Sequence, residues 1–214
     1  MMSAFGASAL GPAPARWMGR YFVGDPGAPL LRRAEPSDAE LIEGLMRSSI
    51  LDLFPAYYDE RQTASAAAHV AHVDMTLIED GTYFVCDIDG VLVACGGWSR
   101  RGKLYTGSGD QKGDDRLLDP RTEAAHIRAM FVRSGWTRRG LGRAIFEASR
   151  AAALIERFRT FDLGATLPGV PFYRSLGFHE VESFVLTMPD GVSINAVRME
   201  MPIQHPGPRA RPKH

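Results

Sequence analysis

The sequence predicts an α/β protein in which helices are interleaved with the strands of a mixed sheet. A hairpin at 83–97 has apolar residues on both strand faces, which is typical of strands that are covered on both sides. A long amphipathic helix at 139–156 and several shorter helical patterns separate the strand patterns along the chain. Together these patterns indicate a central sheet flanked by helices.

The first elements are a short strand at 30–33 and two helices. Pro36 suits the first turn of a helix, and Ser37 with Glu40 has the spacing of a capping box. A second helical pattern runs from 59 to about 73 through an alanine-rich segment.

The hairpin has an Asp-Gly pair at 89–90, the signal for a two-residue type I′ turn. This loop length sets the expected register of the two strands. The expected cross-strand neighbours are Cys86 with Val93 and Cys95 with Phe84. The two thiols are then diagonal neighbours, and we expect both to stay free.

A polar, glycine-rich loop at 99–122 precedes the second half of the chain. The helix at 139–156 is the strongest element there, because its apolar residues recur at steps of three and four. The remaining expected elements are strands at 124–132 and 160–163, a helix at 170–176, and strands at 178–188 and 193–201.

Composition limits the classes of protein. The chain has 214 residues, 45% of them hydrophobic, as in a folded globular protein. Its 25 basic and 25 acidic residues cancel, which disfavours nucleic acid as a partner. No run approaches the ~20 apolar residues of a membrane span, and the start does not have the pattern of a signal peptide. We expect a cytoplasmic protein without nucleic-acid or membrane partners.

One domain is predicted at 29–203. Residues 1–28 are rich in Gly, Ala and Pro without a sustained period, and they predict an N-terminal extension. Residues 204–214 combine Pro with charge and predict a disordered tail.

The segment from Val132 to Arg143 has the pattern of an anion site. A buried strand ends at Val132, and R-R-G-L-G-R then opens the amphipathic helix. The first N–H groups of a helix lack partners within it, glycine allows close approach, and arginine adds charge. The spacing fits neither a P-loop nor G-x-G-x-x-G. It predicts a pyrophosphate site of another kind. The alternative is an ordinary helix start, with glycine for close packing and arginine for solubility.

Two blocks of the sequence resemble the GNAT superfamily of acetyl-CoA-dependent N-acetyltransferases. The first block is Thr137-Arg138-Arg139-Gly140-Leu141-Gly142, similar to the family pattern Q/R-x-x-G-x-G/A, from which Thr137 departs at the first position. The second block is Phe172-Tyr173 followed, after three residues, by Gly177-Phe178 at the start of a strand. The resemblance spans about residues 30–201.

The resemblance implies a GNAT-like acyl-CoA N-acyltransferase fold with a mixed, largely antiparallel sheet. In it the strands at 124–132 and 160–163 run parallel and splay apart, and the pantetheine arm of acetyl-CoA lies in the gap. A backbone N–H beside the thioester holds the developing oxyanion. The implied acetyl-CoA-binding residues are Met130, Phe131, Val132, Thr137, Arg138, Arg139, Gly140, Leu141, Gly142 and Arg143.

The implied reaction is acetyl transfer to a primary amine by direct attack in a ternary complex. Tyr173 matches the family's frequent general acid. His126 lies six residues before Val132, where the histone-modifying branch carries a glutamate base. Glu123 is the nearest carboxylate, and proton release through ordered water is a third route. No metal cofactor is expected.

The acceptor expected from the family is the amine of a small molecule. A protein lysine or N-terminus is the alternative acceptor, and a homodimer is left open. A non-catalytic acyl-CoA-binding sensor or interaction module on the same fold is the alternative class, because such a module would keep the phosphate turn and lose the chemistry.

Overall fold

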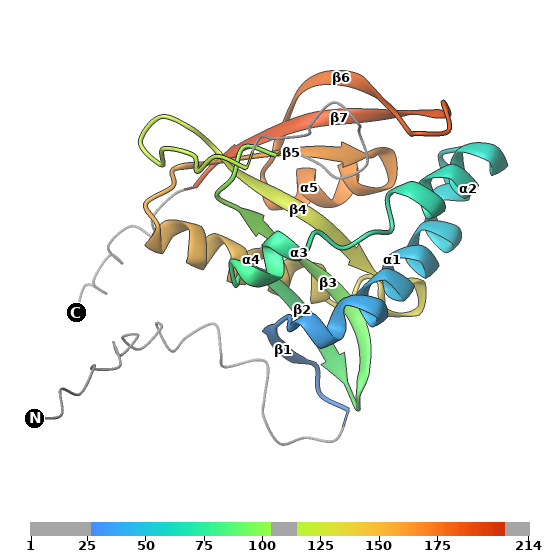
Figure 1. Ribbon diagram of the computed structural model, residues 1–214, viewed down its shortest axis with the longest axis horizontal. Coiled ribbons are helices and arrows are strands. Elements are labelled where there is room, and N and C mark those ends of the chain that lie inside the picture. The colour runs from blue at the N-terminus through green and yellow to red at the C-terminus, as the bar shows by residue number, and fades with distance from the viewer. Residues whose placement is uncertain (1–26, 104–114, 204–214) are drawn as a thin grey trace, which may run out of the picture.

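The computed structural model describes residues 27–103 and 115–203, and these form one sheet with helices on both faces (Figure 1). The strands are β1 (Leu30–Arg33), β2 (Tyr83–Ile88), β3 (Val91–Ser99), β4 (Ala125–Val132), β5 (Thr160–Thr166), β6 (His179–Thr187) and β7 (Ser193–Pro202). The α-helices are α1 (Ala39–Leu53), α2 (Glu60–His69), α3 (Met75–Glu79), α4 (Leu141–Ile155) and α5 (Val170–Leu176). Short 3-10 turns lie at Pro36–Asp38, Phe54–Ala56, Ser134–Trp136 and Leu167–Gly169.

The seven strands follow the order β1-β2-β3-β4-β5-β7-β6. β4 and β5 run parallel, and every other neighbouring pair is antiparallel. The predicted mixed, largely antiparallel sheet flanked by helices is therefore confirmed.

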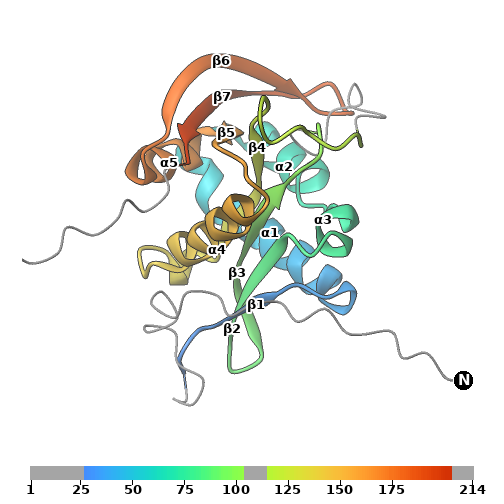
Figure 2. The same cartoon turned by 90° about the vertical axis from the view of Figure 1, so that its left-hand side faces the viewer.

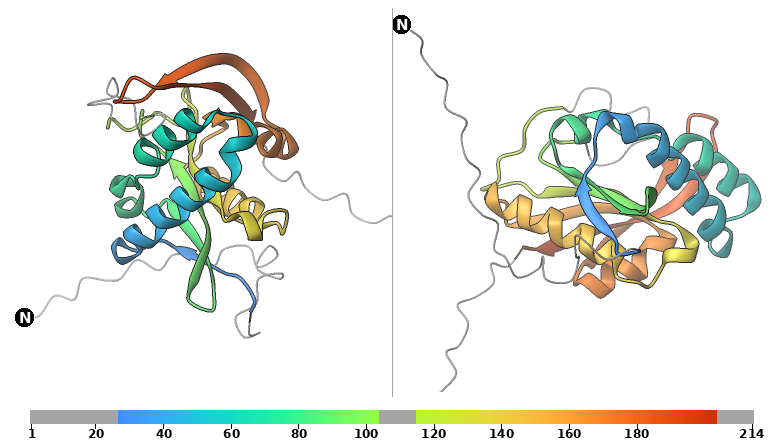
Figure 3. Two further views of the ribbon diagram at one scale, coloured as in Figure 1. Left: turned by 90° about the vertical axis from the view of Figure 1, so that its right-hand side faces the viewer. Right: turned by 90° about the horizontal axis from the view of Figure 1, so that it is seen from below.

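The sheet separates two apolar cores. One core joins the sheet to α4 and α5, and it includes Ile145, Phe146 and Phe161. The other joins the opposite face to α1, α2 and α3, and it includes Ile42 and Leu77. α4 accordingly lies on one side of the sheet and α1 on the other (Figures 2 and 3). Strands that are apolar on both faces are what this layering requires.

The approach to α1 differs from the expected capping box. The Asp38 carboxylate accepts a hydrogen bond from the Glu35 N–H at 2.8 Å and two from the Arg32 guanidinium at 2.6 and 2.8 Å. The capping box is formed by Glu35 and Asp38, and a 3-10 turn precedes the helix. The predicted box of Ser37 with Glu40 is wrong, because Asp38 gains an ion pair with β1 that Ser37 cannot make.

The second predicted helix, at 59 to about 73, ends earlier than expected, and a short helix that was not predicted follows it. α2 ends at His69, and the backbone N–H of Val73 donates to the Glu43 carboxylate of α1 at 3.2 Å. Asp74 then accepts from the Thr76 N–H and caps a separate helix, α3. Capping by Asp74 thus starts a short helix that the sequence prediction did not include.

The β2–β3 hairpin keeps the predicted turn, but its register shifts beyond that turn. Ile88 pairs with Val91, as expected. Val93 is then left without a partner, so that Cys86 lies opposite Ala94. The predicted pairing of Cys86 with Val93 is wrong, because a β-bulge adds one residue to β3.

The same bulge moves the second cysteine to the other face of the sheet. Cys95 lies opposite Val85 and not opposite Phe84. Cys86 belongs to the core under α4, whereas Cys95 belongs to the core under α1. Both thiols are buried and free, as predicted.

The predicted limits of the domain at 29–203 stay a prediction. Apart from residues 27 and 28, the expected extension at 1–28 and the tail at 204–214 lie outside the described residues, as does 104–114 within the polar loop. Within 27–103 and 115–203, no helix is long and apolar enough to cross a membrane.

Candidate active site

The parallel strands β4 and β5 separate soon after they begin. They pair at Ala125 with Phe161 and at His126 with Asp162. Within the described part of the chain, β5 pairs with none of residues 127–132 of β4. The predicted splay is therefore confirmed. An extended ligand can hydrogen-bond to such an unpaired strand edge as an added strand does.

A bulge lies in the middle of this open edge. It leaves Gly96 on β3 and Ala129 and Met130 on β4 outside the pairing register. Ala129 has a φ of 48°, a left-handed conformation that is uncommon for residues other than glycine. A Cβ at Gly96 would collide with the Met130 side chain. Bulges of this kind are frequent next to active sites, where they redirect the backbone.

The last residues of β4 are half-buried and border the gap. Met130 and Val132 pack against the core under α4, and Phe131 packs against the core under α1. The Val132 carbonyl accepts a hydrogen bond from Ser49 Oγ of α1 at 3.0 Å. The expected contact of these three residues with the acetyl end of the donor stays a prediction.

The chain enters α4 through a turn with two left-handed residues, Arg138 at φ 62° and Gly140 at φ 83°. Among the described residues, none apart from Gly140 and its two chain neighbours has an atom within 4 Å of the place where a Gly140 Cβ would stand. Ala144 N–H makes a hydrogen bond to the Gly140 carbonyl at 2.9 Å. The N–H groups of residues 141–143 belong to the first turn of the helix, where no partner exists within the helix itself.

Arginines surround this turn. Arg138, Arg139 and Arg143 are exposed. The Arg139 guanidinium lies over the Trp136 ring, 4.4 Å from its centroid, and Arg143 donates to the Ser175 carbonyl at 3.2 Å. Helix N–H groups and cationic side chains converge here, which is the chemistry of a phosphate site.

Three residues of the predicted acetyl-CoA-binding set also have roles within the protein, and the binding of the donor by their backbone N–H groups stays a prediction. Leu141 is buried in the core, so its side chain is not available to a ligand. A Cβ at Gly142 would stand 3.1 Å from Phe172, which shows that this glycine lets α4 and α5 pack closely. The Thr137 hydroxyl donates to a carbonyl within the turn. A phosphate therefore has room to approach the backbone at Gly140, whereas Phe172 fills the space beside Gly142.

Tyr173 lies on α5 within the apolar core, and its ring is 5.6 Å from that of Phe178. Burial raises the pKa of Tyr173, so the phenol is protonated at neutral pH. The pKa of Tyr83 is raised mainly by burial and also, among smaller effects, by Tyr173. The Tyr83 hydroxyl donates to the Ala129 carbonyl in the bulge of β4.

His126, Asp162 and Glu200 occupy one row across β4, β5 and β7. Their side chains share the sheet face opposite α4, since the neighbouring Phe161 points into the α4 core. His126 and Asp162 are buried. Asp162 accepts from Arg198 Nε at 3.0 Å and Nη2 at 2.9 Å, and Arg198 Nη2 also donates to Glu200 at 2.7 Å.

Glu123, the other candidate base, is held in a different network. Its carboxylate accepts from the two terminal nitrogens of Arg116 at 2.9 and 2.5 Å and from the Asp119 N–H at 2.8 Å. The Arg116 hydrogen bonds, followed by the Asp119 N–H, lower the pKa of Glu123 to about 2. A carboxylate with so low a pKa is a weak proton acceptor at neutral pH, which favours His126 over Glu123.

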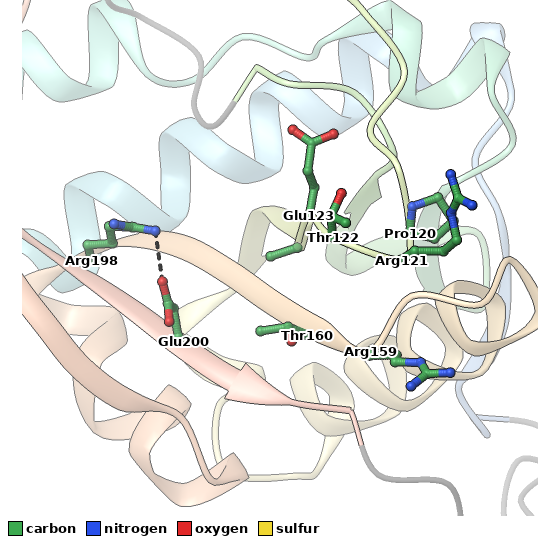
Figure 4. Close-up of a pocket in the computed structure, with 9 residues that line it drawn as sticks. Pro120, Arg121, Thr122, Glu123, Arg159, Thr160, Arg198 and Glu200 are labelled. Carbon is green, nitrogen blue, oxygen red and sulfur yellow. Dashed lines mark hydrogen bonds and ion pairs between the residues drawn. The ribbon is translucent and has the colours of Figure 1, made fainter.

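A cavity of about 300 Å³ opens beside this row, near the beginning of β4 and β5. It is lined by Pro120, Arg121, Thr122, Glu123, Ala124, Arg159, Thr160, Arg198 and Glu200 (Figure 4). Arg198 and Glu200 reach it as an ion pair from β7. The cavity offers both signs of charge to a small polar molecule.

Sequence reasoning missed four polar residues near the gap: Tyr83, Arg128, Asp162 and Arg198. Arg128 is 3% exposed and donates to the Lys103 carbonyl at 2.5 Å and to Asp74 at 3.2 Å. Burial lowers the pKa of Arg128, although the Asp74 carboxylate opposes that effect. A charged residue inside an otherwise apolar strand was the sequence signal that could have found Arg128 and Asp162.

Comparisons with known proteins agree with this geometry. Residues 79–180 match the family model of the acetyltransferase (GNAT) domain. This range holds the β2–β3 hairpin, all of β4, the phosphate turn and Tyr173. No curated protein matches the sequence.

Solved structures share the fold at low sequence identity. The GCN5-related N-acetyltransferase "Aminotransferase, Class-II" from Rhodopseudomonas palustris has a TM-score of 0.62 and 18% identity, with 81% of this chain and 95% of that chain covered. The PaiA N-acetyltransferase from Thermoplasma acidophilum, in complex with coenzyme A, has a TM-score of 0.57 and 12% identity, with 82% and 99% covered. Ard1 from Thermoplasma volcanium has a TM-score of 0.55 and 15% identity, with 83% and 99% covered.

Proposed function

Since the chain carries a GNAT acetyltransferase domain and is an acyltransferase, we propose that it moves an acetyl group from acetyl-CoA to the primary amine of a small molecule. The amine attacks directly in a ternary complex. The observation that carries this proposal is the open edge of β4, which leads from the buried His126 past a bulge to the phosphate turn.

The residues of the turn fit the donor. When bound, acetyl-CoA supplies the acetyl group and its thioester. The N–H groups of 141–143 and the arginines at 138, 139 and 143 would hold its pyrophosphate, and the open space at Gly140 leaves room for it. The unpaired edge of β4 at 127–132 would hold its pantetheine arm.

Two side chains act in the reaction, one on the proton of the amine and one on the departing thiolate. An alkylamine with a pKa near ~10 must lose a proton before it attacks, and His126 is the base we propose because Glu123 is held by Arg116. The bond between the acetyl carbon and sulfur breaks, and the protonated Tyr173 hydroxyl stabilises the departing thiolate by a hydrogen bond, while water supplies the proton of the free thiol. The products are an N-acetyl amide and CoA.

The cavity beside the row of His126 supports a small acceptor. Its volume of about 300 Å³ is at the lower end of small-molecule pockets. Its lining carries Arg198 and Glu200, so an acceptor with its own carboxylate and amine, such as an amino acid, meets complementary charge at both ends. We therefore propose an amino-acid-like amine as the acceptor class.

A thiol-release assay with a panel of amines and amino acids tests the proposal. Steady release of CoA that depends on a small amine supports it. Tight binding of acetyl-CoA without release across the panel would instead favour the non-catalytic binding module. Release that requires a peptide bearing a lysine or a free N-terminus would move the acceptor to proteins.

A further inference from the structure

Tyr83 reaches across one strand to bond to another. It lies on β2, where it pairs with Gly97 of β3. A Cβ on Gly97 would stand 3.0 Å from the Tyr83 ring, so the ring passes over this glycine. The hydroxyl then donates to the Ala129 carbonyl of β4 at 2.8 Å. The whole side chain is buried, with an exposed fraction of 0%.

This hydrogen bond fixes the orientation of one peptide group. The Ala129 carbonyl and the Met130 N–H belong to the same planar trans peptide and point in opposite directions. Tyr83 holds the carbonyl from the side of β3. The Met130 N–H is therefore directed to the other side of β4, where the gap to β5 lies.

We propose that Tyr83 is a positioning residue for acetyl transfer: it holds the peptide between Ala129 and Met130 so that the Met130 N–H is aimed at the acetyl carbonyl oxygen. The proposal rests on the proposed function. A backbone donor stabilises a developing oxyanion effectively when it is held in place before the reaction. Donation by Tyr83 to the carbonyl also polarises the N–H of the same peptide.

The local geometry requires such a restraint. The left-handed φ of 48° at Ala129 is costly for a residue with a Cβ and persists when surrounding contacts enforce it. The Tyr83 hydroxyl supplies one such contact, and Gly96 supplies the space into which Met130 packs. Because burial raises the pKa of Tyr83, the hydroxyl stays a donor across the pH range of an assay.

The variant Tyr83→Phe keeps the ring over Gly97 and removes the donor. We expect kcat to fall at least tenfold, while the Kd of acetyl-CoA changes less than about threefold, because the phosphate turn is untouched. The matched control is Thr82→Val, which removes a buried hydroxyl that donates to the Leu77 carbonyl at 3.2 Å. It should lower Tm and keep kcat. Equal kcat values for the two variants would overturn the proposal.

A second readout does not depend on turnover. The carbonyl stretch of bound acetyl-CoA labelled with ¹³C at the acetyl carbonyl, measured by infrared difference spectroscopy, should lie below that of the free thioester in the wild type. It should return toward the free value in Tyr83→Phe. The same frequency in both proteins overturns the assignment of Tyr83. A wild type that does not bind acetyl-CoA overturns the proposed function, and the role of Tyr83 with it. A shifted frequency without amine turnover supports it and instead overturns the proposed function.

Discussion

Replacing Tyr173 by phenylalanine tests whether its hydroxyl stabilises the departing thiolate or only stabilises the fold. An ordinary phenol has a pKa near ~10 and a thiol near ~8.5, so full transfer of the proton to a thiolate is uphill by about 2 kcal/mol. Burial raises the pKa of Tyr173 and makes the transfer less favourable still. We therefore expect the hydroxyl to stabilise the departing thiolate by a hydrogen bond, and the final proton to come from water.

A hydrogen bond to a charged group contributes about 1.5–3 kcal/mol, which corresponds to a fall in kcat of roughly 10- to 150-fold in Tyr173→Phe. The assay is thiol release at saturating acetyl-CoA, with the Kd of acetyl-CoA and Tm measured beside it. The Kd should stay within about twofold, since the phosphate turn lies elsewhere.

Tyr58→Phe is the matched control for this experiment. The Tyr58 hydroxyl is already bonded to two backbone groups, the Asn195 carbonyl at 2.7 Å and the Leu167 N–H at 2.8 Å. Its loss should lower Tm without removing a donor to the thiolate. A kcat of Tyr173→Phe within twofold of wild type, with a Tm several degrees lower, would refute the reasoning and make Tyr173 a structural residue.

Three further predictions follow from the site and the fold. Gly140→Ala places a side chain at a φ of 83°, and we expect calorimetry to show acetyl-CoA affinity at least tenfold lower with the fold intact; unchanged affinity would contradict the phosphate site. His126→Gln should lower kcat/KM about 100-fold and move the acid limb of its pH profile, and an unmoved limb assigns the proton to water. Arg32 lowers the pKa of Asp38, so this pair stabilises the fold above about pH 4 and loses that effect in acid. Arg32→Met should therefore lower Tm by several degrees at pH 7 and by much less at pH 3.

The order of the elements could be predicted from the sequence, because turn and helix signals are local. The Asp-Gly pair gave the hairpin turn, and the apolar stripe beginning at Leu141 gave α4. The register of the hairpin could not be predicted in the same way. Because both faces of β2 and β3 are apolar, a slip of one residue exchanges one buried side chain for another. The apolar pattern therefore does not distinguish the regular register from the one with a bulge at Val93.

The candidate site likewise has one part that the sequence predicts and one part that it does not. The turn at 138–143, proposed to bind phosphate, is contiguous in the sequence and could be predicted from it. The row of His126, Asp162 and Glu200 comes from three strands, and it forms because the parallel crossover brings β5 beside β4 and a later strand beside β5. A single sequence carries no local signal for such a row, since each member follows from a pairing between distant segments.

The consecutive glycines Gly96 and Gly97 were the unused signal in the sequence. Glycine inside a strand marks a bulge or the close approach of another group. Here Gly96 lies at the bulge between β3 and β4, and Gly97 allows the Tyr83 ring to approach β3. Assigning the approaching group still required the hairpin register, because the unshifted register pairs Tyr83 with Gly96. The bulge at Val93 moves Tyr83 to Gly97, where its ring has room to cross β3. One extra residue in β3 thus brings the Tyr83 hydroxyl to the Ala129 carbonyl, and this hydrogen bond determines the direction of the Met130 N–H.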